Sequence, residues 1–223
     1  ELLKGNHKFL WHGLEIDQRP LNIGLDEKTF QEIWSPKVMQ FFNCLQKTGK
    51  WSEGSNEGTI HWGDARQKIH EIEDSLKFDL ILLDPFSPQK CPELWSEEFI
   101  YLLTTKLSLE GRLITYSTAA SIRSTLKRAG LRIYSIIPSS SEKNKWSAGT
   151  VGIKKNSNQT FISTNCQFKN LSDRELEHLA TRSSIPYRDP TGRGNSEEII
   201  LTRRIEQSES QLINTNSWRK RWN

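Results

Sequence analysis

A short apolar run that ends in an acid and leads toward a helical segment recurs along this chain, and this pattern limits the possible folds. The clearest copy is "DLILLDPFSPQKCPELW", residues 79–95, in which four apolar residues run directly into Asp84. Three prolines follow within eight residues. Such a run, bounded by turn residues, is typical of a buried strand whose tip carries the acid. The pattern predicts an α/β fold with acids at strand ends.

Apolar strands and helical segments alternate as far as about residue 153. The expected strands are 8–17, 59–65, 78–84, 111–117, 131–137 and 148–155. The expected helices follow Pro20 and cover 65–76, 96–107, with Ser96 as a candidate N-cap, and 119–130. Between them, residues 51–58 are rich in Gly, Ser and Asn and are expected to form a loop. Strands separated by helices predict a parallel sheet that is covered by helices.

The last third of the chain has a different character. Ser172, followed three residues later by Glu175, is the signature of a capping box at the start of a helix. The segment "EEIILTRRIEQ" (197–207) predicts another helix, whereas the basic and aromatic end "NSWRKRWN" (216–223) is expected to be a loose tail. We therefore expect a helical extension after the α/β core.

Composition narrows the class of protein. The 223 residues have a mean hydropathy of −0.65 and contain no long apolar run, so no transmembrane helix is expected. The three cysteines, Cys44, Cys91 and Cys166, are far apart and lack metal-ligand spacing. A reduced, cytoplasmic protein without a metal site is the simplest interpretation.

Positive charge is concentrated in the last part of the chain. Residues 138–223 contain 14 Lys and Arg against nine Asp and Glu, whereas residues 1–137 contain 17 and 18. A solvated tail would explain this excess, and so would contact with a polyanion.

Three acids, Glu15, Asp64 and Asp84, each follow an apolar strand. Ligands of open α/β sheets bind beyond the carboxyl ends of the strands, so parallel strands would bring the three acids to one crevice. Each acid could instead only cap the helix or turn that follows it. Their order suits a cofactor with a nucleoside: ribose hydroxyls at Glu15, an adenine amine at Asp64, and the reacting atom at Asp84.

The order "LEID", "GDA", "LDPF" resembles the fold of S-adenosylmethionine-dependent methyltransferases. The resemblance covers about residues 1–155 and implies a Rossmann-like core, with residues 156–223 as the basic C-terminal extension. It also implies S-adenosyl-L-methionine as cofactor, bound by Glu15, Asp64, Asp84 and Pro85. That fold begins with a strand and a Gly-rich loop that have no counterpart upstream of "LEID", so we expect the first strand to be missing from this chain.

The stretch from Leu83 to Ile133 carries a narrower resemblance. It is similar to the methyltransferase half of the bacterial bifunctional enzyme that completes 5-methylaminomethyluridine at the tRNA wobble position. The matching residues are Asp84, Phe86, Pro88, Lys90, Pro92, Trp95, Ser117–Ala120 and Arg123, and Pro85 departs from the glycine of that family. The resemblance implies a methyltransferase without an oxidase domain, which acts on an amine of tRNA in the anticodon region. A separate oxidase or upstream modification enzyme would supply that amine.

The same resemblance implies roles for individual side chains. Asp84 would take a proton from the amine or orient it, while Phe86 and Trp95 would offer flat faces to a uracil ring. Either aromatic residue could instead be a core residue, and for Trp95 the core interpretation is the favoured one. The remaining expected substrate contacts are Lys90, Ser117, Arg123, Lys143 and Lys145.

Two other functions are compatible with parts of the sequence. A polyamine aminopropyltransferase has the same order of acids, but it would need a second acid soon after Asp84, and the next one is Glu93. Net positive charge also suits a cationic substrate poorly. A non-catalytic RNA-binding protein that has lost its cofactor is the other alternative, supported by the missing Gly-rich loop.

Overall fold

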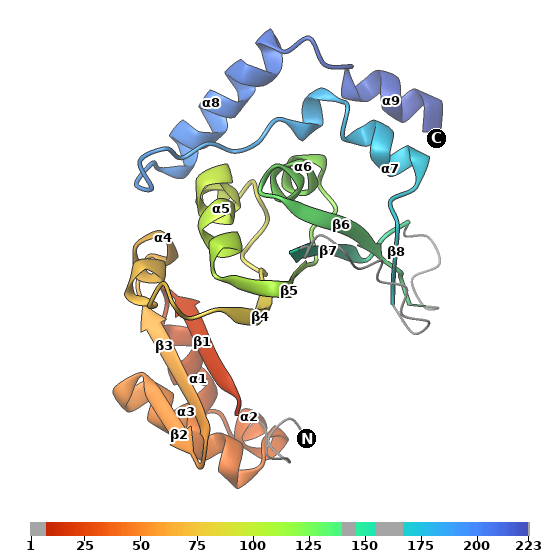
Figure 1. Cartoon of the computed structure of the whole chain (residues 1–223). Helices are drawn as coiled ribbons and strands as arrows, with labels where there is room; N and C mark the ends of the chain where they lie inside the picture. Colours follow the sequence, from red (N-terminus) through yellow and green to blue (C-terminus); the bar gives the residue numbers. More distant parts are fainter. Residues whose placement is uncertain (1–7, 140–145, 155–166, 223) are drawn as a thin grey trace. The chain divides into compact units, whose positions relative to one another are not determined.

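A computed structural model of the chain describes residues 8–139, 146–154 and 167–222. The chain forms two compact units, Glu1–Glu73 and Asp74–Asn223, which we describe separately (Figure 1). The core predicted over 1–155 thus contains the first unit and part of the second. The extension predicted from residue 156 belongs to the second unit. Within the described ranges, no helix is both long and apolar enough to cross a membrane.

The first unit is a three-stranded sheet with helices. Its elements are β1 (Leu10–Glu15), α1 (Arg19–Asp26), α2 (Lys28–Ile33), α3 (Pro36–Thr48), β2 (Lys50–Glu53), β3 (Asn56–Trp62), α4 (Ala65–Lys68) and the 3₁₀ helix η1 (Ile69–Glu71). The strand order is β1-β3-β2, with β1 parallel to β3 and β2 antiparallel to β3. The parallel pair brings the carboxyl ends of β1 and β3 to the same edge.

Two expectations for the first unit are wrong in detail. The predicted loop 51–58 is a hairpin, because Gly54 takes a positive φ of 59° and Trp51 stacks on Phe41 of α3 at 4.4 Å between ring centroids. The predicted helix 65–76 is only α4 and η1, since the chain becomes extended at the buried Ile72.

The second unit contains a five-stranded sheet. Its core elements are β4 (Phe78–Leu82), η2 (Pro92–Trp95), α5 (Glu97–Thr105), β5 (Leu107–Thr115), α6 (Ala120–Arg128), β6 (Leu131–Ile136), β7 (Gly149–Lys154) and β8 (Phe168–Lys169). The strand order is β4-β5-β7-β6-β8. Only β4 and β5 are parallel: β7 runs antiparallel to both neighbours, so the all-parallel expectation is wrong there. Strands β6 and β7 are consecutive along the chain and pair with each other, and such neighbours run antiparallel unless a long crossover joins them. What the sequence analysis expects about the first strand of the methyltransferase fold, which would precede "LEID", stays a prediction.

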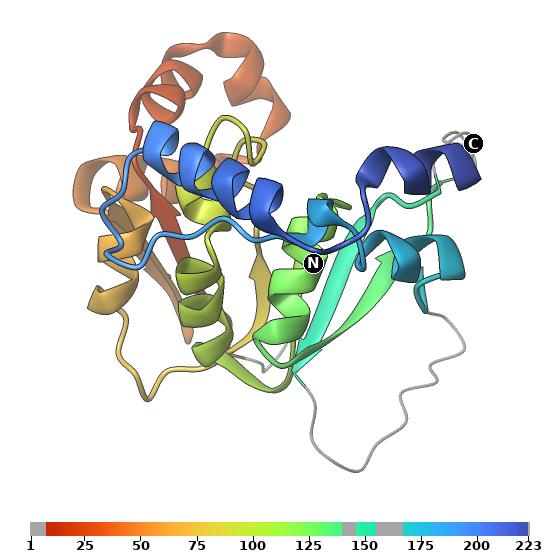
Figure 2. The same cartoon turned by 90° about the horizontal axis from the view of Figure 1, so that it is seen from above.

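Helices α5 and α6 cover one face of this sheet (Figures 1 and 2). As expected, Ser96 caps α5, where its hydroxyl accepts a hydrogen bond from Phe99 N. The core beneath is apolar; Ile100, Leu113 and Ile122, for example, are fully buried.

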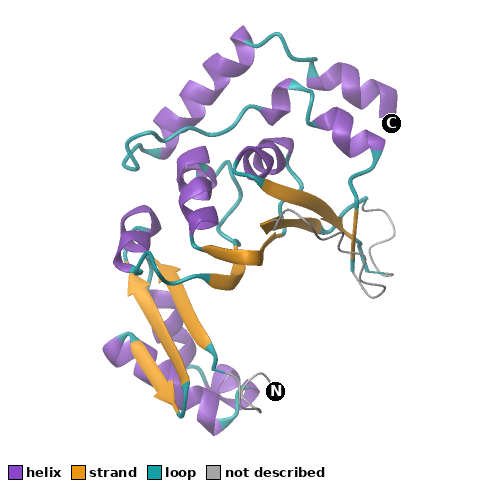
Figure 3. Ribbon diagram, in the orientation of Figure 1, coloured by secondary structure: helices purple, strands orange, loops and turns teal. Residues whose placement is uncertain are grey.

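The C-terminal extension adds a helical layer on the side of α5 and α6 away from the sheet (Figure 3). Its elements are α7 (Asp173–His178), η4 (Arg182–Ser184), α8 (Ser196–Glu209) and α9 (Thr215–Trp222). The capping box of Ser172 and Glu175 is confirmed. The end of the chain, expected to be a loose tail, is helix α9. Its buried Trp218 stacks on His178 at 4.1 Å between ring centroids, and burial lowers the pKa of this histidine to about 4.

Polar contacts fasten the extension to α5. The backbone N of Glu97 donates to the carbonyl of Tyr187 at 2.9 Å, and Arg188 binds Glu98 at 2.8 Å. Ser196, at the start of α8, donates to Glu93 at 3.0 Å. The extension is therefore built into the second unit.

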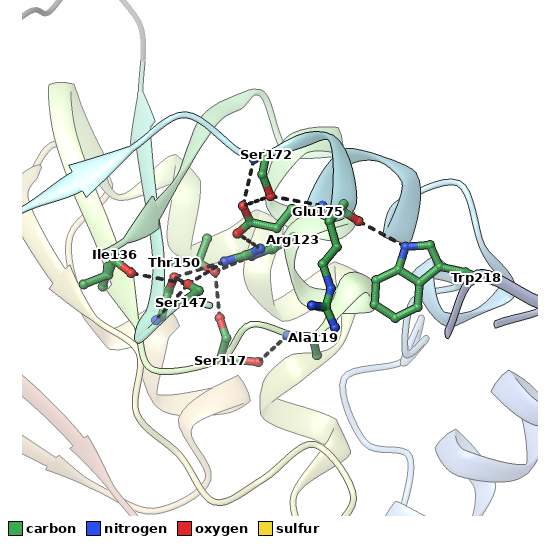
Figure 4. Close-up of polar contacts among 11 residues, drawn as sticks. Ser117, Ala119, Arg123, Ile136, Ser147, Thr150, Ser172, Glu175 and Trp218 are labelled. Carbon is green, nitrogen blue, oxygen red and sulfur yellow. Dashed lines mark hydrogen bonds and ion pairs between the residues drawn. The ribbon is translucent and has the colours of Figure 1, made fainter. Parts of the chain in front are cut away.

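A buried ion pair makes the deepest connection (Figure 4). Arg123 of α6 and Glu175 of α7 each have side chains that are 1% exposed, and Arg123 Nη1 lies 2.7 Å from Glu175 Oε1. Arg123 also donates to Thr150 Oγ1 at 2.8 Å, to Ser147 Oγ at 3.0 Å and to the carbonyl of Gly149 at 3.1 Å. Its guanidinium therefore joins α6, β7 and α7.

Glu175 takes part both in the ion pair with Arg123 and in the capping box of α7. Its second oxygen accepts from the N–H and the hydroxyl of Ser172, at 2.8 and 2.7 Å, which completes the capping box. Burial opposes the charged form, but the bonds from Ser172 and Arg123 outweigh it, so the pKa of Glu175 lies below its usual value. The carboxylate remains charged at neutral pH and compensates the buried guanidinium.

We predict that Glu175→Gln lowers the free energy of unfolding by about 3–5 kcal/mol, because it leaves a buried arginine without its counter-charge. Chemical denaturation measures this change. Asp173→Asn is the matched control, an exposed acid in the same helical turn, and should cost less than about 1 kcal/mol. Equal effects of the two variants would show that the ion pair does not hold the extension.

Candidate functional site

Glu15 and Asp64 lie at one edge of the first sheet. Glu15 ends β1 and pairs with Trp62 at the end of the parallel strand β3, and Asp64 follows two residues later. Gly63 links the two strand ends, since its N–H donates to the carbonyl of Glu15 at 2.8 Å. It has a φ of 133°, and an added Cβ would lie 2.9 Å from Lys68, so the turn favours glycine.

The Glu15 carboxylate is exposed, and only one of its two oxygens accepts hydrogen bonds from described residues. Its Oε1 accepts hydrogen bonds from the backbone N–H groups of Ile16 and Asp17, at 2.7 and 2.9 Å. Its Oε2 has no hydrogen-bond partner among the residues that the structure describes. One oxygen thus holds the turn, and the other can accept a hydrogen bond from a ligand hydroxyl.

Asp64 caps helix α4, as the structural alternative predicted. Its side chain accepts from the N–H of Arg66 at 2.9 Å and forms an ion pair with the Arg66 guanidinium at 2.7 Å. Burial opposes the negative charge, yet the bonds from Arg66 outweigh it and lower the pKa of Asp64. Its contact with a cofactor stays a prediction, and Arg66 would share the carboxylate.

Asp84 lies in the second unit, directly after Leu83, whose N–H donates to the carbonyl of Ile114 at 2.8 Å. The Asp84 side chain is exposed and makes no hydrogen bond or ion pair with any described residue. Phe86, two residues on, is 75% exposed. An open carboxylate is therefore followed, two residues later, by an open aromatic side chain. That all three acids share one crevice stays a prediction.

Trp95 lies beside this turn but is buried. Its side chain is 0% exposed, and its indole Nε1 donates to the carbonyl of Phe86 at 2.7 Å. Trp95 is therefore a core aromatic in this structure, as the alternative had it, and a flat face for uracil at Trp95 stays a prediction. Its indole N–H instead fixes the turn that carries Asp84.

Sequence reasoning missed Tyr116. Its hydroxyl donates to the carbonyl of Pro85 at 2.8 Å, and its ring meets Trp95 edge-on at 5.9 Å between centroids. Burial first, and then the negative charge of Asp84, raise the pKa of Tyr116, so the phenol stays protonated and remains a donor. The position of Tyr116, near the carboxyl end of the expected strand 111–117, was the available signal.

The other expected substrate contacts differ in accessibility. Ser117 is 6% exposed, and its carbonyl accepts from the hydroxyl of Thr150 at 2.7 Å. Arg123 is enclosed by the network described above, and a direct substrate contact by it stays a prediction. Lys90 is exposed. Lys143 and Lys145 lie outside the described residues.

The residue types suit a nucleoside-bearing cofactor. Glu15 and Asp64 offer carboxylate oxygens on adjacent strand ends, which are suitable acceptors for ribose hydroxyls and an amine. Among the described residues, no group of three or more His, Cys, Asp or Glu side chains is arranged to hold a metal ion.

Comparison with known proteins defines the class. The family model for S-adenosyl-L-methionine-dependent methyltransferases matches residues 28–150, which is more than half of the chain. The chain therefore belongs to the family of S-adenosyl-L-methionine-dependent methyltransferases.

Individual relatives refine this picture. The tRNA 5-methylaminomethyl-2-thiouridine biosynthesis bifunctional protein MnmC of Azoarcus sp. is 37% identical over 75 residues, which are 34% of this chain and 12% of that protein. The uncharacterized protein MJ0670 of Methanocaldococcus jannaschii is 28% identical over 186 residues, 82% of this chain and 48% of that protein. This chain thus spans half or less of the length of these relatives.

A solved structure shows the same fold. The crystal structure of MNMC2 from Aquifex aeolicus aligns with a TM-score of 0.64 and 20% identity, covering 90% of this chain and 69% of that one. Together with the family model and the MnmC relatives, it confirms the predicted fold class and the resemblance carried by the "LDPF" stretch.

We predict that Glu15→Ala and Asp64→Ala each weaken binding of S-adenosyl-L-methionine by about 1–3 kcal/mol, because each removes a charged hydrogen-bond acceptor. Isothermal titration calorimetry measures this loss. Asp17→Ala is the control, since Asp17 is held by Arg19 and its pKa is lowered to about 2 by the bonds from that arginine. Wild-type affinity in both test variants would mean that the cofactor binds elsewhere.

Proposed function

We propose that this protein transfers a methyl group from S-adenosyl-L-methionine to the amine of 5-aminomethyl(-2-thio)uridine at the wobble position of tRNA. The family assignment supports the reaction class, and the names of the MnmC relatives support the tRNA substrate. The observation that carries the proposal is the open carboxylate of Asp84, which has no partner in the described chain and is followed two residues later by the exposed Phe86.

The chemistry of an amine explains why an unpaired acid is needed. When bound, S-adenosyl-L-methionine supplies an electrophilic methyl group on a sulfonium. An ammonium nitrogen has no free electron pair, so the substrate must lose a proton before it can react. The Asp84 carboxylate accepts a hydrogen bond from the amine and takes its proton. An acid already paired with an arginine would perform this task less well.

The surroundings of Asp84 suit a base that is flipped out of its stack. The Phe86 ring, 75% exposed, offers a face on which a uracil ring can stack. Pro85 and Pro88 stiffen the turn, which reduces the entropy lost when the reacting groups are aligned. The turn therefore supplies both a base platform and an acceptor for the amine.

The substrate implies partners. An oxidase or another upstream modification enzyme must deliver a tRNA that carries a primary amine on the uracil 5-substituent. Such a substrate would also place the reaction in the cytoplasm. The aminopropyltransferase alternative needs a second acid soon after Asp84. None of the five residues that follow Asp84 is an acid, so the sequence does not favour this alternative.

Replacement of Asp84 by Asn should leave cofactor affinity near normal but lower the rate of methyl transfer about a hundredfold or more, because the amide keeps the shape and loses the base. Single-turnover methylation of tRNA that carries the 5-aminomethyl group measures the rate. Asp79→Asn is the matched control, an exposed acid at the other end of β4, bound by Ser108. A wild-type rate for Asp84→Asn at neutral pH would reduce Asp84 to a turn residue.

A surface for tRNA is expected in the basic extension. Not all of its arginines are available: Arg203 is bound to the carbonyls of Ile185 and Ser183, and Arg188 pairs with Glu98. The exposed basic residues of the extension include Arg193, Arg204, Arg219 and Lys220. Two of these, Arg219 and Lys220, lie on helix α9. This helix is therefore our best candidate for a tRNA-binding surface in the described part of the extension.

Arg219→Ala combined with Lys220→Ala should weaken tRNA binding and leave the saturated rate within a few-fold, because phosphate contacts contribute affinity and not chemistry. The slope of log affinity against log salt should fall by up to about one unit per charge removed. Lys143→Ala with Lys145→Ala should act in the same way. The control pair is Lys127→Ala with Arg132→Ala, exposed charges outside the extension. An unchanged slope in both test pairs would remove the basic residues of 138–223 from the RNA surface.

A further inference from the structure

The two carbonyl groups that follow Asp84 are both bound by aromatic side chains from other parts of the second unit. Tyr116, just after β5, donates its hydroxyl to the carbonyl of Pro85 at 2.8 Å. Trp95 of η2 donates its indole N–H to the carbonyl of Phe86 at 2.7 Å. We call Trp95 and Tyr116 the aromatic bracket.

The two members of the bracket support each other. Their rings pack edge-on, with an interplanar angle of 89°. Because Trp95 is 0% exposed, its N–H must find an acceptor inside the protein, and the Phe86 carbonyl is that acceptor. A carbonyl on an exposed turn would normally be free to bond with water, so its capture by a buried donor restricts the turn.

This capture limits the torsions around Asp84. The Pro85 ring fixes its own φ, and a following proline also restricts the backbone of Asp84. The hydrogen bond from Tyr116 then sets the orientation of the Pro85 carbonyl, and therefore the ψ angle of Pro85. On the other side, the N–H of Leu83 is held by the carbonyl of Ile114. The backbone of Asp84 is held from both directions, whereas its carboxylate remains open.

We propose that Tyr116 is a positioning residue, whose hydroxyl holds the Pro85 carbonyl and thereby aims the Asp84 carboxylate at the amine of the substrate. This inference rests on the proposed function, because it assumes that Asp84 acts on an amine. Tyr116 does not itself exchange a proton with the substrate. The Tyr116 hydroxyl donates its only proton to the carbonyl of Pro85. Burial and the charge of Asp84 raise the pKa of Tyr116, so the hydroxyl stays protonated.

Tyr116→Phe removes only the hydroxyl and tests the proposal with two independent measurements. The first is hydrogen exchange of the amides of Lys90 and Cys91, which donate to the carbonyl of Ser87 at 2.8 and 3.0 Å within the same turn. Their exchange should become about tenfold faster when the bracket loosens. The second is kinetics: kcat should fall about tenfold, with the Kd for S-adenosyl-L-methionine and the KM for tRNA within twofold.

Tyr101→Phe is the matched control, because Tyr101 is a 60% exposed tyrosine on α5. It should change neither measurement. Trp95→Phe, which keeps an aromatic ring and loses the indole N–H, should act like Tyr116→Phe on both.

The outcomes separate this inference from the proposed function. Unchanged exchange in Tyr116→Phe overturns the bracket, whether or not the protein is active. Faster exchange with a wild-type kcat overturns the positioning role. If the wild-type protein binds S-adenosyl-L-methionine but methylates no amine-bearing tRNA, the proposed function fails and the positioning role fails with it. Faster exchange would then show only that the bracket holds the turn.

Discussion

The buried charge of Arg123 is the constraint on which the second unit depends. A guanidinium that is 1% exposed costs several kcal/mol unless a carboxylate and further acceptors surround it, and Glu175 is the carboxylate that does so. Because Glu175 belongs to α7, the extension supplies a part without which α6 would carry an unpaired charge. Thr150 then connects Arg123 to the carbonyl of Ser117, the residue directly after Tyr116. The network that holds the extension thus ends beside the segment that holds the Asp84 turn.

Local signals in the sequence predicted the local structure well. The apolar runs before Glu15 and Asp84 are strands, Ser96 caps α5, and Ser172 with Glu175 forms the capping box. These features depend on residues a few positions apart, which a sequence displays directly. The direction of β7 was not predictable in this way, because β7 also pairs with β5, a strand far earlier in the chain. The hairpin at 51–58 was missed, although the turn at Gly54 that forms it is local.

Roles that depend on distant partners were harder to predict. Phe86 and Trp95 are both aromatic residues in one proline-rich stretch, yet one is 75% exposed and the other is 0% exposed. Arg123 matches a family position, but its ion-pair partner lies 52 residues further along the chain. Helix α9 looked like a solvated tail because the contacts that bury Trp218, with His178 and with the carbonyl of Arg174, are made only in the folded unit. In each case burial decides the role, and burial is a property of the folded unit.

The three strand-end acids show how one neighbouring residue changes what an acid can do. Glu15 accepts bonds from the N–H groups of the next two residues, and Asp64 from the N–H and the guanidinium of Arg66. After Asp84 comes Pro85, which has no N–H to offer, so the nearest capping donor is absent. The same proline stiffens the backbone, and the bracket of Trp95 and Tyr116 binds the two carbonyls that follow. The turn is therefore held through its carbonyl groups and not through its acid, which leaves the carboxylate of Asp84 available to a ligand.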